Sequence, residues 1–242
     1  MIGDDKGLPA SLAGLFGAAA GLYARRFPLY ASLAVLAIGV QYIVDTLVLP
    51  GDFGLLLGLD IIIGGFLAAT VSIGTAFDLQ GKEADWSRIV MAASLRWGVV
   101  TLIAFLAQFV YALFAPYLTL PLSQTGFGLL ILPFIVIWAA VWMSTVVASI
   151  EPAQSRLLLP LLALGKGLGV STRFTNLGRL MLYALLMLIP IYAEMFVETT
   201  LLAHKIPNSV FWSNVTIDMI ALGPLQALAT VFYVDFLRRT GR

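Results

Sequence analysis

Apolar residues run along this chain in long stretches that short polar segments interrupt. Six stretches are long enough to cross the ~30 Å hydrocarbon core of a bilayer as helices, since each residue of a helix adds ~1.5 Å. The predicted spans are 27–49, 55–77, 98–120, 127–149, 177–203 and 213–236. This pattern predicts an all-α integral membrane protein whose six transmembrane helices form three hairpins.

A shorter helical segment precedes each predicted hairpin. Residues 8–23 are rich in glycine and alanine and too short to span, and 150–176 holds an apolar piece broken by proline and glycine. Residues 84–97 place aromatic and aliphatic side chains at helical spacing, which is typical of an interfacial helix. We therefore expect one cytoplasmic-side interfacial helix before each hairpin, within a single membrane domain over 1–242. The possible repeats are 8–78, 79–151 and 152–236.

The composition indicates that lipid surrounds most of the chain, and it excludes several kinds of catalytic and metal site. Hydrophobic residues make up 60% of the 242 positions and charged residues only 11%, about half the charged fraction of soluble domains. A net charge of +1 gives no basic signal for nucleic acid. The absence of cysteine excludes thiol nucleophiles and cysteine-based metal sites, and a single histidine, His204, excludes multi-histidine sites. We expect no cofactor, no metal and no catalytic residue, although the sequence alone leaves enzymatic activity open.

Lysine and arginine fix the expected orientation. Six crossings place 13 of the 14 basic residues on one side, with only Lys205 opposite. Because cytoplasmic loops carry an excess of lysine and arginine, both termini are expected in the cytoplasm. Four arginines at the cytoplasmic edge are expected to contact anionic lipid headgroups, which makes membrane lipids the predicted partners. They are Arg26, Arg96, Arg173 and Arg179.

Acidic residues inside the predicted spans are the candidate site. Counted from Arg179 at ~1.5 Å per residue, Glu194 lies roughly 22 Å and Glu198 roughly 28 Å along its helix. The same count places the rest of the candidate polar or cation site at similar depth, in the outer third of the membrane: Gln41, Asp45, Asp60 and Asp218. A carboxylate at the bilayer centre costs ~2.5–3.5 kcal/mol on the insertion scale, so such groups usually face a bundle interior or a wet cavity.

Two interpretations of these acids stay open. If the helix faces converge, the site is strongly anionic and suits a cation, a proton or a polar headgroup. Alternatively, the acids are groups of an outer vestibule or of turns, which water reaches. Pro190 and the Gly223-Pro224 pair interrupt the two spans that carry Glu194 and Asp218, and broken helices beside buried acids occur in transporters.

Three short motifs carry a resemblance to a known family. They are Ser149-Ile150-Glu151-Pro152, Leu164-Gly165-Lys166-Gly167 and the ending Phe232-Tyr233-Val234-Asp235-Phe236-Leu237-Arg238. With this layout the chain resembles the membrane domain of glycerophosphoryl diester phosphodiesterases and related uncharacterised bacterial inner-membrane proteins. The resemblance implies a multipass fold and a bacterial inner-membrane location. It does not imply phosphodiesterase activity, which belongs to a separate soluble domain in that family.

Three functions fit these observations. The first is a non-enzymatic membrane protein that acts as a scaffold or lipid-interacting domain. The second is a transporter or channel for a cation, a proton or a lipid-like solute that uses the buried acids. The third is a membrane-embedded hydrolase with the same acids around a divalent metal. A polar cavity reaching Glu194 would favour the second, and acids splayed into separate outer loops would favour the first.

Overall fold

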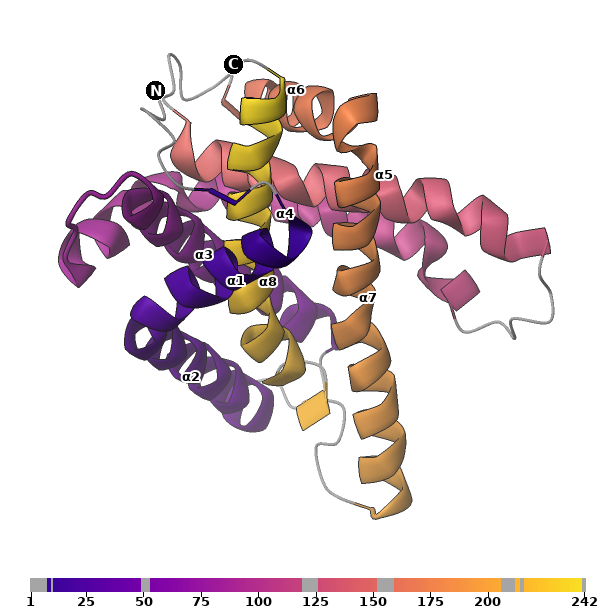
Figure 1. Cartoon of the computed structure of the whole chain (residues 1–242). Helices are drawn as coiled ribbons and strands as arrows, with labels where there is room; N and C mark the ends of the chain where they lie inside the picture. Colours follow the sequence, from indigo (N-terminus) through magenta and orange to yellow (C-terminus); the bar gives the residue numbers. More distant parts are fainter. Residues whose placement is uncertain are drawn as a thin grey trace.

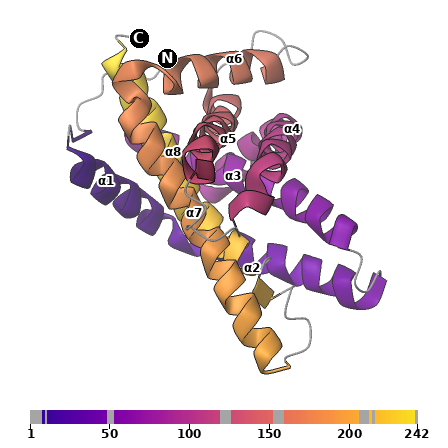
Figure 2. The ribbon, with the colours of Figure 1, turned by 90° about the vertical axis from the view of Figure 1, so that its right-hand side faces the viewer.

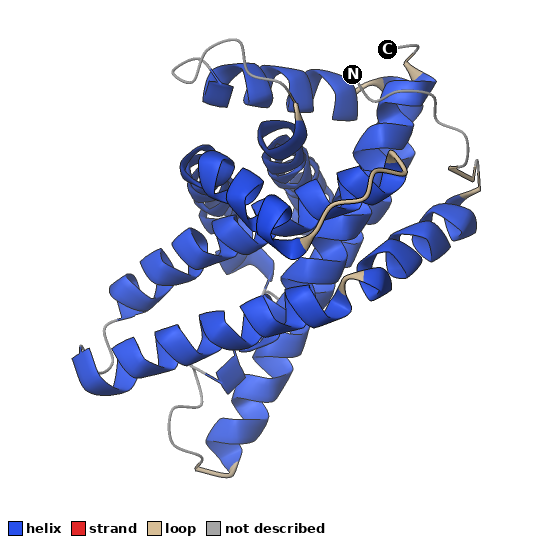
Figure 3. Ribbon diagram, turned by 90° about the vertical axis from the view of Figure 1, so that its left-hand side faces the viewer, coloured by secondary structure: helices blue, strands red, loops and turns tan. Residues whose placement is uncertain are grey.

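The chain is almost entirely helical in the part that the computed structural model describes. This part comprises residues 8–9, 11–48, 53–118, 126–151, 159–205, 212–213 and 216–240, and none of them lies in a strand (Figure 3). The helices are α1 (Leu12–Arg25), α2 (Phe27–Ile43), α3 (Phe53–Leu79), α4 (Trp86–Leu118), α5 (Gly126–Ile150), α6 (Leu159–Ser171), α7 (Phe174–Ala203) and α8 (Thr216–Arg239). A one-turn π-helix, η1 (Val44–Val48), extends α2.

Five of these helices are long and apolar enough to cross a membrane. The consecutive helices α1 and α2, bent by 73° at Arg26, add a sixth crossing if the pair is one span. The all-α multipass fold predicted from the sequence is therefore confirmed. The hairpins α2–α3, α4–α5 and α7–α8 point in different directions: in Figure 1, α2 lies at the lower left, α4 and α5 extend to the right, and α7 runs downward. Figure 2 shows α4 and α5 nearly end-on beside the inclined α7 and α8.

One predicted boundary is wrong. The expected interfacial helix over 84–97 and the expected span over 98–120 are a single helix, α4. Asp85 caps its start, since the Asp85 carboxylate accepts a hydrogen bond of 2.9 Å from the Arg88 backbone N–H. The amphipathic and apolar stretches meet without a proline or a capping residue, so the backbone hydrogen bonds continue through Gly98.

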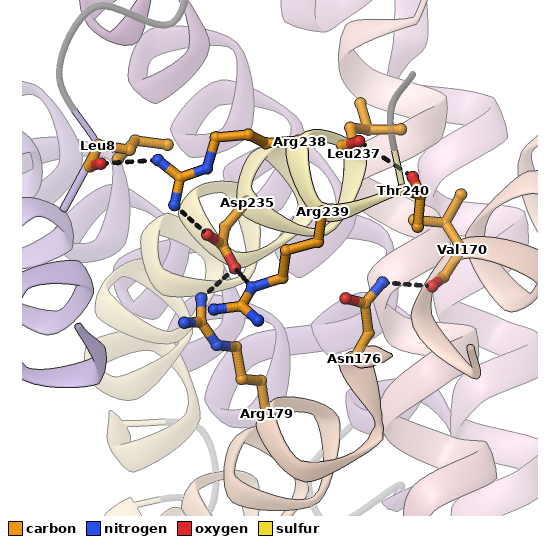
Figure 4. Close-up of polar contacts among 9 residues, drawn as sticks. All are labelled: Leu8, Val170, Asn176, Arg179, Asp235, Leu237, Arg238, Arg239 and Thr240. Atoms are coloured by element: carbon orange, nitrogen blue, oxygen red, sulfur yellow. Dashed lines mark hydrogen bonds and ion pairs between the residues drawn. The ribbon is translucent and has the colours of Figure 1, made fainter. Parts of the chain in front are cut away.

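The two other short helices are separate elements, as expected. Ser11 caps α1 by accepting a hydrogen bond of 3.1 Å from the Gly14 backbone N–H. Helix α6 packs closely on α5 at Gly167, where an added Cβ would lie 2.8 Å from the Cα of Ser144. The Asn176 side chain then donates a 2.8 Å hydrogen bond to the Val170 carbonyl and joins the start of α7 to α6 (Figure 4).

Helix α8 is the most buried of the spanning helices and carries a polar group at its centre. The fully buried Gln226 amide donates to the Ser72 hydroxyl at 2.8 Å and to the Thr145 hydroxyl at 3.0 Å. Its carbonyl oxygen accepts from the Trp142 indole N–H at 2.9 Å. Since these partners belong to α3 and α5, one side chain holds three helices together within the apolar core.

Each hairpin ends on an acid that is ion-paired. Asp78 accepts two hydrogen bonds, of 2.6 and 2.8 Å, from Arg26, and Glu151 pairs with Lys166 at 2.7 Å. Asp235 is fully buried and accepts from three arginines, Arg179, Arg238 and Arg239 (Figure 4). Arg238 also donates to the Leu8 carbonyl at 2.7 Å, which ties the start of the described chain to its end.

These ion pairs correct part of the headgroup prediction. The Arg26 and Arg179 side chains are only 12% and 10% exposed, because both guanidinium groups point inward to carboxylates rather than outward to lipid. Arg96 and Arg173 are half-buried, and for them headgroup contact stays a prediction.

Candidate functional site

A cavity of about 130 Å³ lies between α3, α4, α5, α7 and α8. It is large enough for several water molecules, since one needs ~10–15 Å³. Three of the predicted acids line it, one from each of three helices: Asp60 of α3, Glu194 of α7 and Asp218 of α8. The middle hairpin contributes polar and aromatic groups instead: Gln108, Tyr111, Trp138 and Trp142.

The lining residues follow the helical repeat on each element. Along α7 they recur as Tyr183, Met187, Pro190 and Glu194, and along α8 as Asp218, Leu222 and Leu225. Residues three, four and seven positions apart share one face of a helix. Each helix therefore turns one continuous face toward the cavity, which the sequence encodes by spacing.

The three acids form a cluster of neighbouring carboxyl groups. The Asp218 carboxyl lies close to both the Asp60 and the Glu194 carboxyl, and the Asp60 and Glu194 carboxyls are near enough to interact with each other. All three side chains are partly exposed. Asp218 also lies in the first turn of α8, where the helix dipole favours negative charge. Repulsion between carboxylates this close favours a bound cation or proton.

The remaining predicted site residues stand outside the cavity lining. Gln41 of α2 is fully buried and lies close to Asp60, but it does not line the cavity. Glu198 is one turn beyond Glu194, near enough to interact with it, but it does not line the cavity. The side chain of Asp45 lies outside the described part of the structure.

Several polar atoms at the cavity are buried without a hydrogen-bond partner among the described residues. They include the hydroxyl of the fully buried Tyr183 and the indole N–H of Trp138, which is 6% exposed. One carboxyl oxygen of Asp60 and one of Glu194 are likewise buried without a hydrogen-bond partner among the described residues. Because buried polar groups are normally paired, the cavity combines unused donors with unused acceptors, as a binding site for a polar ligand does.

Among the described residues, the charged side chains that line the cavity are all acidic. No lysine, arginine or histidine occurs among the described residues that line the cavity. The described residues also contain no group of three His, Cys, Asp or Glu side chains arranged to hold a metal ion. The described residues therefore give the metal-dependent hydrolase no support.

Tyr111 and Tyr183 are lining residues that the sequence analysis did not single out. A signal for Tyr183 was present, since it precedes Glu194 by three helical turns and so lies on the same face. Tyr111 follows Gln108 by three positions, at the same helical spacing. Neither position could be recognised from the sequence alone, because tyrosine in an apolar helix is also an ordinary core or interface residue.

Comparisons with known proteins give no relative from which a function could be transferred. No protein-family model matches the chain, and neither the curated proteins nor the solved structures include a match. The resemblance to the phosphodiesterase membrane domain therefore stays a prediction, and the function has to be argued from the cavity.

Proposed function

We propose that the chain is a non-enzymatic carrier of the bacterial inner membrane, with both termini in the cytoplasm, which binds a cation in the cavity between its three hairpins. The observation that supports the proposal is that Asp60, Glu194 and Asp218 line one cavity. A scaffold needs no such convergence. Ionisable residues within a membrane usually mark substrate or ion pathways, because their desolvation is costly.

The prolines inside α7 and α8 support a carrier rather than a static binding protein. Pro190 lines the cavity and has no backbone N–H, so the Leu186 carbonyl lacks the usual helical donor. Pro224 likewise leaves the Ile220 carbonyl of α8 without its usual helical donor. Missing backbone hydrogen bonds next to a binding site are typical of transporters, in which they permit rearrangement around the bound solute.

The test is uptake of radiolabelled cations, rubidium and methylammonium, into proteoliposomes of the purified protein. We expect Glu194→Gln to lower uptake about tenfold, because it removes a charge-assisted contact in the cavity. Glu198→Gln is the matched control, since Glu198 has the same chemistry one turn away and does not line the cavity. It should retain uptake within about twofold, a typical consequence of a change outside the site.

Two results would contradict the proposal. One is uptake of both cations no faster than in protein-free vesicles. The other is an equal loss of uptake in Glu194→Gln and Glu198→Gln, which would separate transport from the cavity.

A further inference from the structure

An apolar groove runs along the outside of the cavity, between α1, α7 and α8. Its volume is about 400 Å³, and its walls include Phe16 and Ala20 of α1, Ile189 of α7 and Leu228 of α8. Ile189 is 60% exposed and Ala20 is exposed as well. In a bilayer, an exposed apolar groove on a spanning helix faces the lipid chains.

The groove and the acidic cavity share a wall. Three residues line both spaces: Pro190 of α7, and Ala221 and Leu225 of α8. The apolar groove therefore lies directly against the cavity that Glu194 and Asp218 line. The shared wall also includes the point where Pro190 interrupts α7, and it lies next to Pro224 of α8.

We infer that the ligand of the cavity is an amphipathic cation, an amine with an alkyl chain and no phosphate, which occupies the groove with its chain and the cavity with its ammonium group. The inference rests on the proposed function and names its substrate class. Its basis is that a carboxyl-lined cavity and a lipid-facing apolar groove adjoin across one shared wall.

Charge complementarity selects the headgroup. The ammonium group would meet three carboxyls and could donate to the unpartnered oxygens of Asp60 and Glu194. A phosphate-bearing lipid would bring a second negative charge, and no described residue that lines the cavity or the groove is basic. The same cavity that attracts an ammonium group therefore repels a phosphate.

The chain and the headgroup have different roles in binding. Moving an alkyl chain from the bilayer into an apolar groove gains little free energy, because lipid chains are as apolar as the groove. The chain therefore serves to bring the amine to the cavity from the side, and preference between ligands comes from the headgroup. A test must compare ligands of equal chain length.

The test is electron paramagnetic resonance of doxyl-labelled amphiphiles in vesicles that contain the protein. The probes are dodecylammonium, dodecanol and dodecyl phosphate, each labelled at the same carbon, and the measured quantity is the fraction of probe that the protein immobilises. We expect the ammonium probe to bind about tenfold more tightly than the alcohol, since only the ammonium makes charge-assisted contacts. The phosphate should bind no better than the alcohol.

Two substitutions separate the groove from the cavity. Ala20→Trp fills the groove on a lipid-facing position, and we expect it to lower ammonium binding about fivefold by overfilling the chain site. Ala13→Trp is the matched control, because Ala13 lies two turns away on the same helix, is exposed and does not line the groove. The double variant Glu194→Gln, Asp218→Asn should abolish the preference for ammonium over alcohol.

The outcomes distinguish this inference from the function on which it rests. Equal immobilisation of ammonium and alcohol probes, or equal effects of Ala20→Trp and Ala13→Trp, would overturn the inference even if rubidium uptake depends on Glu194. An ammonium preference that survives the double variant would overturn both. Phosphate binding as tight as ammonium binding would overturn the assigned charge of the ligand.

Discussion

Asp235 shows how much a single residue contributes at the end of the bundle. Its carboxylate is fully buried and accepts hydrogen bonds from three guanidinium groups, of which Arg179 comes from a different helix. Removing one member of a buried ion pair is far more costly than never having the pair, because the partner charge stays buried without compensation.

We expect Asp235→Asn to lower the stability of the detergent-solubilised protein by about 3–5 kcal/mol, because Arg179 loses its counter-charge. The measurement is thermal unfolding followed by intrinsic fluorescence. Glu83→Gln removes the same type of charge from an exposed loop position and should change stability by less than about 0.5 kcal/mol. Equal transitions for the two variants would show that the arginine cluster is energetically unimportant.

Gln226 is the second residue whose loss has a defined cost. Gln226→Leu keeps the volume but removes the amide that donates to the Ser72 and Thr145 hydroxyls and accepts from the Trp142 indole N–H. Polar contacts between membrane helices contribute ~0.6 kcal/mol on average and up to ~1.7, so we expect a loss of about 1–2 kcal/mol in the same unfolding assay. A variant as stable as the wild type would mean that water replaces the amide.

At the scale of single residues, the sequence predicted how far along its helix each acid lies, but not which way its side chain faces. A fixed rise per residue placed Asp60, Glu194 and Asp218 at one level of the membrane, and the structure brings these three together. The same count grouped Glu198 with them, but the cavity ends one turn earlier. Which face of each helix points inward depends on packing between helices, and a one-dimensional pattern does not contain that information.

At the scale of elements, close packing depends on particular glycines rather than on glycine spacing. Gly165 and Gly169 have the small-xxx-small spacing that favours helix contacts, yet an added Cβ at either would meet open space. Gly167, between them, is the position that touches Ser144 of α5. The spacing identified a glycine-rich helix but not the contact face.

We therefore expect Gly167→Leu to push α6 away from α5 and to cost about 1–3 kcal/mol of stability by overpacking. Gly165→Leu adds the same side chain two positions earlier, where no atom is within 4 Å, and should be nearly neutral. Thermal unfolding of the two purified variants compares them directly. If Gly165→Leu proved the more damaging of the two, the packing of α6 would have to be reassigned.

The expected break inside α4 is the prediction at this scale that the structure contradicts. The sequence pattern changes from amphipathic to fully apolar near Gly98, and this change was taken as a boundary. A change in hydrophobic pattern reports a change in surroundings, whereas a helix ends only where backbone hydrogen bonds are capped or interrupted. Between Asp85 and Pro116 the chain offers neither.

At the scale of the whole molecule, the all-helical multipass fold followed from the sequence, whereas the division into separate helices and their directions in space did not. Hydrophobic length defines a crossing, but tilt is set by packing against neighbouring helices. The spread of the three hairpins in Figures 1 and 2 is therefore information that only the structure supplies, and the central cavity is its direct result.

Orientation in the membrane can be tested because the chain contains no cysteine. Lys205→Cys and Lys82→Cys each introduce one thiol at an exposed position. We expect a membrane-impermeant maleimide to label Lys205→Cys in intact spheroplasts and Lys82→Cys only after lysis, because the basic side is predicted to be cytoplasmic. The unsubstituted protein, which contains no cysteine, is the negative control. Labelling of both variants in intact spheroplasts would contradict the six-crossing arrangement.

The burial of α8 has a consequence for how the protein is made. Helix α8 is synthesised after the helices that converge on it: it supplies Asp218 to the cavity, Gln226 to the core and Asp235 to Arg179. Helices inserted earlier during translation therefore lie in the lipid without these polar partners until α8 is inserted. A nonsense mutation just before Asp235 should thus expose the newly made chain to membrane proteases, although the helices before α8 have already been inserted.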